Sequence, residues 1–325
     1  MPRFLGIDTS NYTTSAALYD TSDNSIVMQK KLLPVKKGEL GLRQSDAVFH
    51  HTMQLPQIIH EISDKCDLKD IDGIGVSDRP RNADGSYMPC FMCGSGLAES
   101  LSSVMNIPVY RTSHQIGHIL AALYSADRLE LVQGKFAAFH VSGGTTDCLL
   151  CTPDSDNILD IALTASSLDL KGGQLIDRTG VMLGLDFPCG KELEKLASGC
   201  KTDVRKSGLR PVLKNGNCCM SGFQNKLEKM HSNGCPPEDI ARACEYAVAV
   251  TVGAMTEYSE SANGSLPIIY AGGVMSNRYI ASFLSKGRKA YFAQPEYSCD
   301  NAAGTAIFAA IRSGCADPGM MRRSE

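Results

Sequence analysis

The sequence lacks two features that would place a protein in or across a membrane. None of its apolar runs reaches the roughly 18 residues that a membrane-spanning helix needs. The first residues, MPRFLGIDTS, hold no apolar core of the length found in secretory signal peptides, and their pattern predicts a strand. We therefore expect a cytoplasmic protein.

An excess of charge of one sign is also missing. The 325 residues carry 32 Lys and Arg against 35 Asp and Glu, which gives a net charge of -3. No strong overall field therefore draws the protein to nucleic acid. Binding to RNA would need a partner protein or a local basic patch, and residues 195–214 hold the densest run of Lys and Arg.

Cysteines are frequent, but they follow no regular spacing. There are thirteen, and CFMC at residues 90–93 has the spacing of half a zinc site. No second pair of this kind follows, so the sequence gives little support for a structural zinc. Reduced thiols in a reducing compartment are the expectation for this pattern.

Short apolar runs alternate along the chain with longer stretches of helical spacing. RFLGID and LPIIYAGG are typical of buried strands. PEDIARACEYAVAVTVGAMTEYSESA is typical of a long helix, with proline and acidic residues at its start. The alternation predicts an α/β protein with mixed sheets, and the length favours two lobes over one compact core.

One pattern occurs twice. A predicted strand runs into GIDTSNYTTS near the N-terminus, and another runs into HVSGGTTD near the middle of the chain. Both are typical of strand–turn–strand units with small and hydroxylated residues at the tip. Two such hairpins about half a chain apart suggest two related lobes, although the repeat is short enough to arise by chance.

Two glycine-rich turns follow predicted buried strands in the second half of the chain. SGGTTD, residues 142–147, offers consecutive backbone N–H groups that can cradle phosphate oxygens. AGGVMSN, residues 271–277, leads from a strand into a helix start, which is a natural anion site. Asn277 suits a contact with a base or ribose, or a helix cap. Each turn alone is typical of an ordinary tight turn, whereas the two together favour a nucleotide site.

Asp177 lies in a third glycine-rich stretch, residues 169–190. Its carboxylate would suit a contact with a ribose or nucleotide. The alternative is a solvent-facing acid beside Arg178, and the sequence leaves both interpretations open.

Two histidines four residues apart, His114 and His118, lie in RTSHQIGHILAAL, which otherwise has the pattern of a buried helix. Residues at this spacing share one helix face and can both reach one ion. Zinc proteases carry a glutamate directly after the first histidine, and Gln115 stands there instead. Asp300, before an alanine-rich helix, is a candidate third ligand or an N-cap. If there is no third ligand, the alternative is that both histidines are packing residues of a core helix.

The order of seven motifs resembles that of the TsaD family, once called glycoproteases, along nearly the whole chain. These motifs are GIDTS, SHQIGH, HVSGG, GGQLIDRTG with LGLDFPCG, MSGFQN, AGGVMSN and CDNAAGTA. The resemblance implies an actin-like ATPase (ribonuclease-H-like) α/β fold with two lobes, residues 1–130 and 131–325, and an interlobe cleft. The last helix would pack back towards the first lobe.

The resemblance also implies an activity. Family members transfer a threonylcarbamoyl group from an adenylate to an adenosine beside the tRNA anticodon. The ligand of this chain would then be ATP or an acyl-adenylate, and its macromolecular substrate would be tRNA. Its partners would be TsaB-like and TsaE-like proteins, or a second copy of the chain.

By the same resemblance, matching positions take roles. His114, His118 and Asp300 would hold one divalent metal ion, iron or zinc, acting as a Lewis acid. Asp8 matches an acid of the family and is the catalytic candidate. The remaining matches would hold the adenylate, at its phosphate or carbamoyl part and at its ribose and base: Ser142, Gly143, Gly144, Thr145 and Thr146, then Asp177, Gly190 and Asn277.

The chain departs from the usual family pattern near the expected centre. Tyr12 and Thr13 stand where the family usually has two acids, Gln44 and Gln174 where it has glutamates, and Thr145 where it has a histidine. A longer loop, residues 77–94, replaces a glycine-proline-glycine turn. Losing negative charge changes catalysis and metal electrostatics more than the fold. The chain therefore resembles a divergent paralogue.

Three alternatives to transfer onto tRNA stay open. The chain could bind nucleotide and metal without catalysis, as a partner or regulator of another synthase. It could transfer a carbamoyl group to a small molecule. The third alternative is a metallopeptidase, the older description of the family, and Gln115 in place of an acid argues against it.

Overall fold

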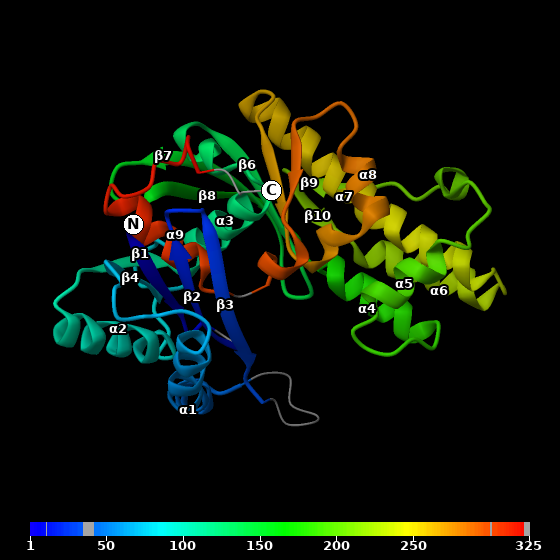
Figure 1. Ribbon diagram of the computed structural model, residues 1–325. Coiled ribbons are helices and arrows are strands. Elements are labelled where there is room, and N and C mark those ends of the chain that lie inside the picture. Colours follow the sequence, from blue (N-terminus) through cyan, green and yellow to red (C-terminus); the bar gives the residue numbers. More distant parts are fainter. Residues whose placement is uncertain (11, 35–41, 300, 322–325) are drawn as a thin grey trace. The chain divides into compact units, whose positions relative to one another are not determined.

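The computed structural model describes residues 1–10, 12–34, 42–299 and 301–321. Packing divides the chain, coloured by sequence in Figure 1, into two compact units. Unit 1 comprises residues 1–134, 152–161 and 296–325, and unit 2 comprises residues 135–151 and 162–295. The segment after residue 295 therefore belongs to the same unit as the N-terminal residues.

Unit 1 is built on a five-stranded mixed sheet with the strand order β3-β2-β1-β4-β5. Strand β1 pairs antiparallel with β2 and parallel with β4, and β4 pairs parallel with β5. The strands are β1 (Arg3–Asp8), β2 (Thr13–Asp20), β3 (Ser25–Leu32), β4 (Gly73–Arg79) and β5 (Val109–Ser113). The carboxyl ends of β1, β4 and β5 therefore meet at one edge of the sheet.

Helices cover both faces of this sheet. They are α1 (Gln44–Ser63), α2 (Phe91–Met105), α3 (His114–Ser125) and α9 (Ala303–Arg312), with a 3-10 turn at Leu129–Gln133. Leu5 and Ile7 of β1 join the apolar core formed with α1 and α2. Because side chains alternate along a strand, Gly6 and Asp8 point to the opposite face, where Gly6 lies against α9.

Glycines allow α9 to lie directly on the sheet and on α3. A Cβ placed on Gly75 would lie 1.9 Å from the carbonyl oxygen of Thr305. A Cβ on Gly304 would lie 1.8 Å from the carbonyl oxygen of Gly117, which lies between the two histidines of α3. Such contacts between backbones are open only to glycine, so these residues fix how closely α3 approaches α9.

The second sheet has the strand order β12-β11-β6-β7-β8 and lies in unit 2, except for residues 152–161 around the β7–β8 turn, which belong to unit 1. Its strands are β6 (Phe136–Val141), β7 (Thr146–Asp154), β8 (Ile158–Ser166), β11 (Ile268–Ala271) and β12 (Ala290–Phe292). The antiparallel pair β6–β7 corresponds to β1–β2, and the parallel pairs β6–β11 and β11–β12 correspond to β1–β4 and β4–β5. This shared topology confirms the predicted repeat of the hairpin, and the two mixed sheets confirm the α/β class.

The remaining elements of unit 2 pack mainly around one long helix. They are α4 (Gly172–Met182), α5 (Gly190–Ala197), α6 (Ser221–Ser232), α7 (Pro237–Asn263) and α8 (Arg278–Leu284), a ribbon of β9 (Val212–Lys214) and β10 (Asn217–Cys219), and 3-10 turns at Val204–Ser207, Gly273–Ser276 and Pro295–Tyr297. Helix α7 begins with proline and two acids, as predicted, and its buried face lies in the core of the unit. Among the described residues, no helix combines the length and the apolar character needed to cross a membrane.

Candidate functional site

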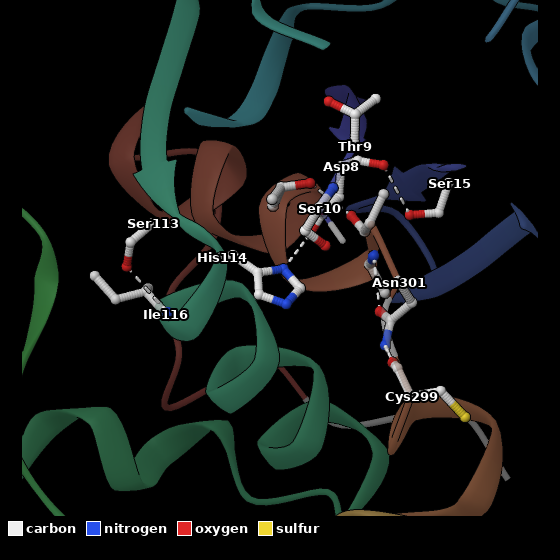
Figure 2. Close-up of polar contacts among 12 residues, drawn as sticks. Asp8, Thr9, Ser10, Ser15, Ser113, His114, Ile116, Cys299 and Asn301 are labelled. Carbon is white, nitrogen blue, oxygen red and sulfur yellow. Dashed lines mark hydrogen bonds and ion pairs between the residues drawn. The ribbon is translucent and has the colours of Figure 1, made fainter. Parts of the chain in front are cut away.

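The first group of predicted site residues lies in unit 1, at the edge where the parallel strands end. Asp8 is the last residue of β1, and His114 is the first residue of α3, directly after β5. Figure 2 shows the imidazole of His114 turned towards the Asp8 carboxylate, with 2.7 Å between Nδ1 and Oδ2. Strand pairing thus brings together two residues that lie 106 positions apart in the sequence.

Asp8 is buried, with 1% of its side chain exposed. Its Oδ1 accepts a hydrogen bond from the backbone N–H of Ser10 at 2.8 Å, and its Oδ2 faces His114. Both oxygens are therefore engaged within the protein. This geometry suits an acid that orients an imidazole, because its carboxylate favours a proton on Nδ1 and directs Nε2 away.

The two histidines share one face of α3, as their spacing predicts. The centroids of the His114 and His118 rings are 4.2 Å apart, with the rings at 72° to each other. Ser113 caps the helix by accepting the N–H of Ile116 at 3.3 Å. The helix therefore begins at His114. Gly117 between the two histidines rests on Gly304 of α9.

The predicted third metal ligand, Asp300, lies outside the described residues. Its neighbour Asn301 is buried, and its side-chain amide donates to the carbonyl of Cys299 at 2.7 Å and that of Tyr297 at 3.2 Å (Figure 2). Its Oδ1 accepts the N–H of Ala303 at the start of α9. Within the described part of the chain, no three His, Cys, Asp or Glu residues gather as a metal site. The metal therefore stays a prediction.

The second group of predicted site residues lies in unit 2, at the tip of the β6–β7 hairpin. Residues 142–145 form a tight turn in which the N–H of Ser142 donates to the carbonyl of Thr145 at 2.8 Å. Gly143 and Gly144 are exposed, and a Cβ added to either would meet no other residue within 4 Å. The outer side of this turn is thus open backbone.

The start of α4 packs directly beneath this turn. A Cβ on Gly173 would lie 2.6 Å from the backbone nitrogen of Gly143. The buried hydroxyl of Thr146 accepts the N–H of Gly172 at 2.9 Å and donates to the carbonyl of Thr145 at 2.8 Å. The turn and the positive end of a helix macrodipole therefore lie side by side, an arrangement that favours anions.

Asp177, Gly190 and Asn277 lie on three neighbouring elements of the same unit. The Oδ1 of Asp177 accepts the N–H of Cys189 at 2.9 Å, which joins α4 to the start of α5 at Gly190. Asn277 caps α8 by accepting the N–H of Ile280 at 3.0 Å. The helix-cap interpretation of Asn277 is therefore present in the structure.

The residues that follow Gly190 and Asn277 in the sequence, Lys191 and Arg278, line a cleft of about 590 Å³. Its walls come from α5, α7 and α8, and cationic side chains are frequent among them: Lys191, Glu194, Lys195, Ser198, Arg242, Arg278, Tyr279 and Ser282. The sequence did not predict that these residues line a common cleft. The available signal was a charged pair, Arg242 and Glu245, within a helix that is otherwise largely apolar.

Two of the residues that depart from the usual family pattern form hydrogen bonds with the backbone. The side-chain oxygen of Gln44 accepts the N–H of Cys90 at 3.3 Å, and that of Gln174 accepts the N–H of Lys171 at 3.1 Å. Thr13 is buried in β2, whereas Tyr12 is exposed. Each glutamine therefore accepts a hydrogen bond from a backbone N–H group, a role that needs no negative charge.

Solved structures resemble the whole chain. The activator of the 2-hydroxyisocaproyl-CoA dehydratase from Clostridium difficile with bound ADPNP matches 96% of this chain and 97% of its own, with 12% identity and a TM-score of 0.53. Full-length HypF in its phosphate- and nucleotide-bound form matches 97% of this chain and 55% of its own, with 12% identity and a TM-score of 0.58. At this identity the likeness concerns the fold alone, which is the predicted actin-like ATPase fold.

Within this fold class, the sequence identifies the family. The model of TsaD, tRNA N6-adenosine threonylcarbamoyltransferase, matches residues 27–307. The chain therefore belongs to the TsaD family. A curated tRNA N6-adenosine threonylcarbamoyltransferase from Aromatoleum aromaticum is 29% identical over 333 residues, covering 98% of this chain and 93% of that protein.

Proposed function

We propose that this protein transfers a threonylcarbamoyl group from its adenylate to an adenosine next to the tRNA anticodon, with one bound divalent metal ion, iron or zinc. Membership of the TsaD family supports the class of reaction. The observation that carries the proposal for this chain is the buried contact between Asp8 and His114. It is the arrangement expected for a histidine that offers its other nitrogen to a metal.

The residues of unit 1 fit a metal ion. Two imidazoles lie on one helix face, and a carboxylate holds the Nδ1 of one of them, so that Nε2 is the nitrogen that would coordinate the ion. Asp300 would complete the ligand set. When bound, the metal would supply a Lewis acid for a phosphate or carbamoyl oxygen. Asp8 is then a positioning residue, and the histidines are ligands.

Replacing Asp8 by asparagine tests that role. An amide keeps the size of the side chain but loses the charge that favours a proton on the His114 Nδ1. We expect the affinity for the metal to fall by about 10–100-fold, the range found when partners of ligating histidines are removed. Metal content and competition with a chelator give the measurement. An unchanged affinity in a folded variant would show that Asp8 has no part in the metal site.

The turn and helix start of unit 2 are proposed to hold the phosphate of the adenylate. The exposed backbone at Gly143 and Gly144, beside the start of α4, supports an anion site there, and the N–H of Gly144 also donates to Ser142 Oγ at 3.3 Å. The cleft lined by α5, α7 and α8 is proposed to receive the ribose and base, beside Asp177, Gly190 and Asn277. The Lys and Arg side chains in its wall suit a nucleotide more than a neutral ligand.

Replacing Gly173 by alanine is expected to weaken nucleotide binding by at least about 10-fold. The new Cβ would displace the backbone of the turn, since it would lie 2.6 Å from the Gly143 nitrogen. Isothermal titration with ADP measures the effect. Gly222→Ala, on the exposed side of α6 with nothing within 4 Å, is the matched control. Equal affinities of the two variants would contradict the proposed phosphate site.

The proposed chemical step moves the carbamoyl group from a phosphate oxygen to a nitrogen of the tRNA. The exocyclic amine of the target adenine attacks the carbamoyl carbon, a C–N bond forms, and the bond from that carbon to the phosphate oxygen breaks. AMP leaves with the bonding electron pair, and the amine loses a proton. The residues of the chain contribute by orienting the adenylate, and the backbone N–H groups of the turn stabilise negative charge on the departing phosphate.

The direct test uses the purified full-length chain loaded with iron or zinc. It is incubated with threonylcarbamoyl-adenylate and unmodified tRNA, alone and with a TsaB-like and a TsaE-like protein. We expect modified nucleoside and AMP in equal amounts. If no product forms in any of these mixtures while metal and nucleotide still bind, transfer to tRNA is ruled out as the function.

A second candidate function is a nucleotide- and metal-binding paralogue that lacks transfer activity and regulates a true synthase. The presence of Gln44 and Gln174 supports it, because the family usually has glutamates there and an amide carries no negative charge. The same transfer assay separates the two candidates. A chain that inhibits or stimulates another family member, but forms no product itself, would support this second function.

Partners and location complete the proposal. We propose that the protein acts in the cytoplasm on tRNA, together with TsaB-like and TsaE-like proteins or as a homodimer. With a net charge of -3, the chain offers little overall attraction to tRNA, and this favours help from a partner. Binding of labelled tRNA across a range of salt concentrations, with and without these proteins, tests that dependence.

A further inference from the structure

A buried carboxylate in unit 2 links two of the elements that form the wall of the cleft. Glu245 of α7 is fully buried. Its Oε2 accepts a hydrogen bond from Arg242 Nη1 at 2.5 Å, and its Oε1 accepts one from Asn277 Nδ2 at 2.6 Å. A charge removed from water in this way is costly unless both oxygens have partners, and here each has one.

The carboxylate determines how Asn277 is oriented. The amide nitrogen of Asn277 faces Glu245, so its Oδ1 faces the N–H of Ile280 and caps α8. Asn277 is itself buried, with 7% exposed. Both ends of its carboxamide are therefore engaged, and the position of the start of α8 depends on Glu245.

Arg242 connects the same carboxylate to the other wall of the cleft. Its Nη2 donates to the carbonyl of Ala197, at the end of α5, at 3.0 Å. Its guanidinium lies 4.2 Å from the centre of the Tyr279 ring on α8. One side chain therefore contacts α5, α7 and α8, which are the three helices that line the cleft.

We propose that Arg242 and Glu245 are positioning residues for the nucleotide site: ionised Glu245 holds Asn277 and Arg242, and these two hold α8 and α5 at the spacing that accepts a nucleoside phosphate. The inference rests on the proposed function, in that unit 2 binds the adenylate. It adds two residues that sequence reasoning did not single out.

The protonation of Glu245 gives this arrangement a pH dependence. Burial raises the pKa of Glu245 to about 7, although the hydrogen bond from Asn277 and the charge of Arg242 act in the opposite direction. Above that pH the carboxylate accepts from both partners, and below it the added proton removes an acceptor. The ionisable groups that bear on it are Arg242 and Cys244 on α7, Glu194 on α5 and Tyr279 on α8.

A double-mutant cycle tests the proposal, with the dissociation constant of ADP measured on the full-length chain at pH 8. Arg242→Ala leaves the buried charge of Glu245 without its cation, and we expect at least a tenfold weaker affinity. Arg242→Ala combined with Glu245→Gln removes that charge but keeps an oxygen that accepts from Asn277. The double variant is expected to stay at least tenfold weaker than the wild type, because it still lacks the contacts of Arg242 with Ala197 and Tyr279. Thermal unfolding of each variant confirms that it is folded.

A pH profile provides a second readout that a merely structural role would not change. Between pH 6 and pH 8, the ratio of wild-type to Glu245→Gln affinity cancels the titration of ADP itself. We expect this ratio to rise as the pH passes through 7. If Arg242→Ala fails to fold, Arg242→Lys, which retains the charge but loses the planar contact with Tyr279, replaces it in the cycle, with a smaller loss expected.

The outcomes separate this inference from the proposed function. If the wild-type chain does not bind ADP, the nucleotide site fails and the inference fails with it. If the wild type binds, but the double variant returns to within about threefold of its affinity, Arg242 only neutralises Glu245, and its positioning role is overturned while the nucleotide site stands. A pH-independent affinity ratio would also overturn it.

Discussion

Replacing His118 by alanine is expected to lower the affinity for the divalent metal by at least about 100-fold and to abolish transfer to tRNA. His118 shares the face of α3 with His114, whose other nitrogen is held by Asp8. Removing one imidazole would leave a single histidine and Asp300 for the ion. The fold should survive, because His118 is only partly buried and alanine is a good helix former.

Metal content after dialysis, measured beside the rate of nucleoside formation, checks this expectation. His60→Ala is the matched control, since His60 is also a helical histidine but is exposed, with its Nε2 3.8 Å from Asp64 Oδ2. The control should bind metal and react as the wild type does. A His118→Ala variant that retains both metal and activity would exclude the histidine pair as the metal site.

Replacing Gly304 by alanine should destabilise unit 1 by about 3 kcal/mol or more, at the upper end of what overpacking costs. The new Cβ would lie 1.8 Å from the carbonyl oxygen of Gly117, which is backbone and cannot rotate away. Helices α3 and α9 would have to separate, and the histidines of α3 would move with them. Loss of metal affinity should therefore accompany the loss of stability.

Unfolding in urea, followed by circular dichroism, measures this effect. Gly96→Ala is the control, because Gly96 also lies within a helix but has nothing within 4 Å of a Cβ. Alanine there should leave stability unchanged or raise it by up to about 1 kcal/mol. Equal stabilities of the two variants would show that α3 and α9 do not depend on this close contact.

The sequence predicted the features that depend on local pattern. Apolar runs and glycine turns predicted the two hairpins, and the repeated topology of the two sheets confirms them. The spacing of His114 and His118 predicted that they share a helix face, and their rings lie 4.2 Å apart. These features follow from periods of two and of 3.6 residues, which are visible without knowledge of the packing.

The contacts of polar side chains depend on packing, so the sequence alone did not predict most of them. Nothing in the local sequence shows that Asp8 lies beside His114, because strand pairing creates that contact. In the same way, the hydroxyl of Thr14 donates to Gln54 and contacts the Nδ1 of buried His51 at 2.8 Å, a network that joins β2 to α1. The contact of the Asn277 amide nitrogen with Glu245 inside unit 2 was equally hidden, whereas its helix cap was one of the predicted alternatives.

The altered residues near the expected centre bear on catalysis more than on the fold. Gln44 and Gln174 bind backbone N–H groups, so the local structure tolerates their lack of charge. An amide at these positions carries no negative charge, so any group that a family carboxylate would attract there is held less strongly.

The proposed modification of tRNA is tested most directly by analysing the tRNA of a cell in which this chain is the only TsaD-family protein. Digested tRNA is examined by liquid chromatography and mass spectrometry for threonylcarbamoyladenosine. We predict the modified nucleoside with the wild-type chain and its loss with His118→Ala. Absence of the nucleoside, while the wild-type protein accumulates with its metal bound, would contradict the proposed function.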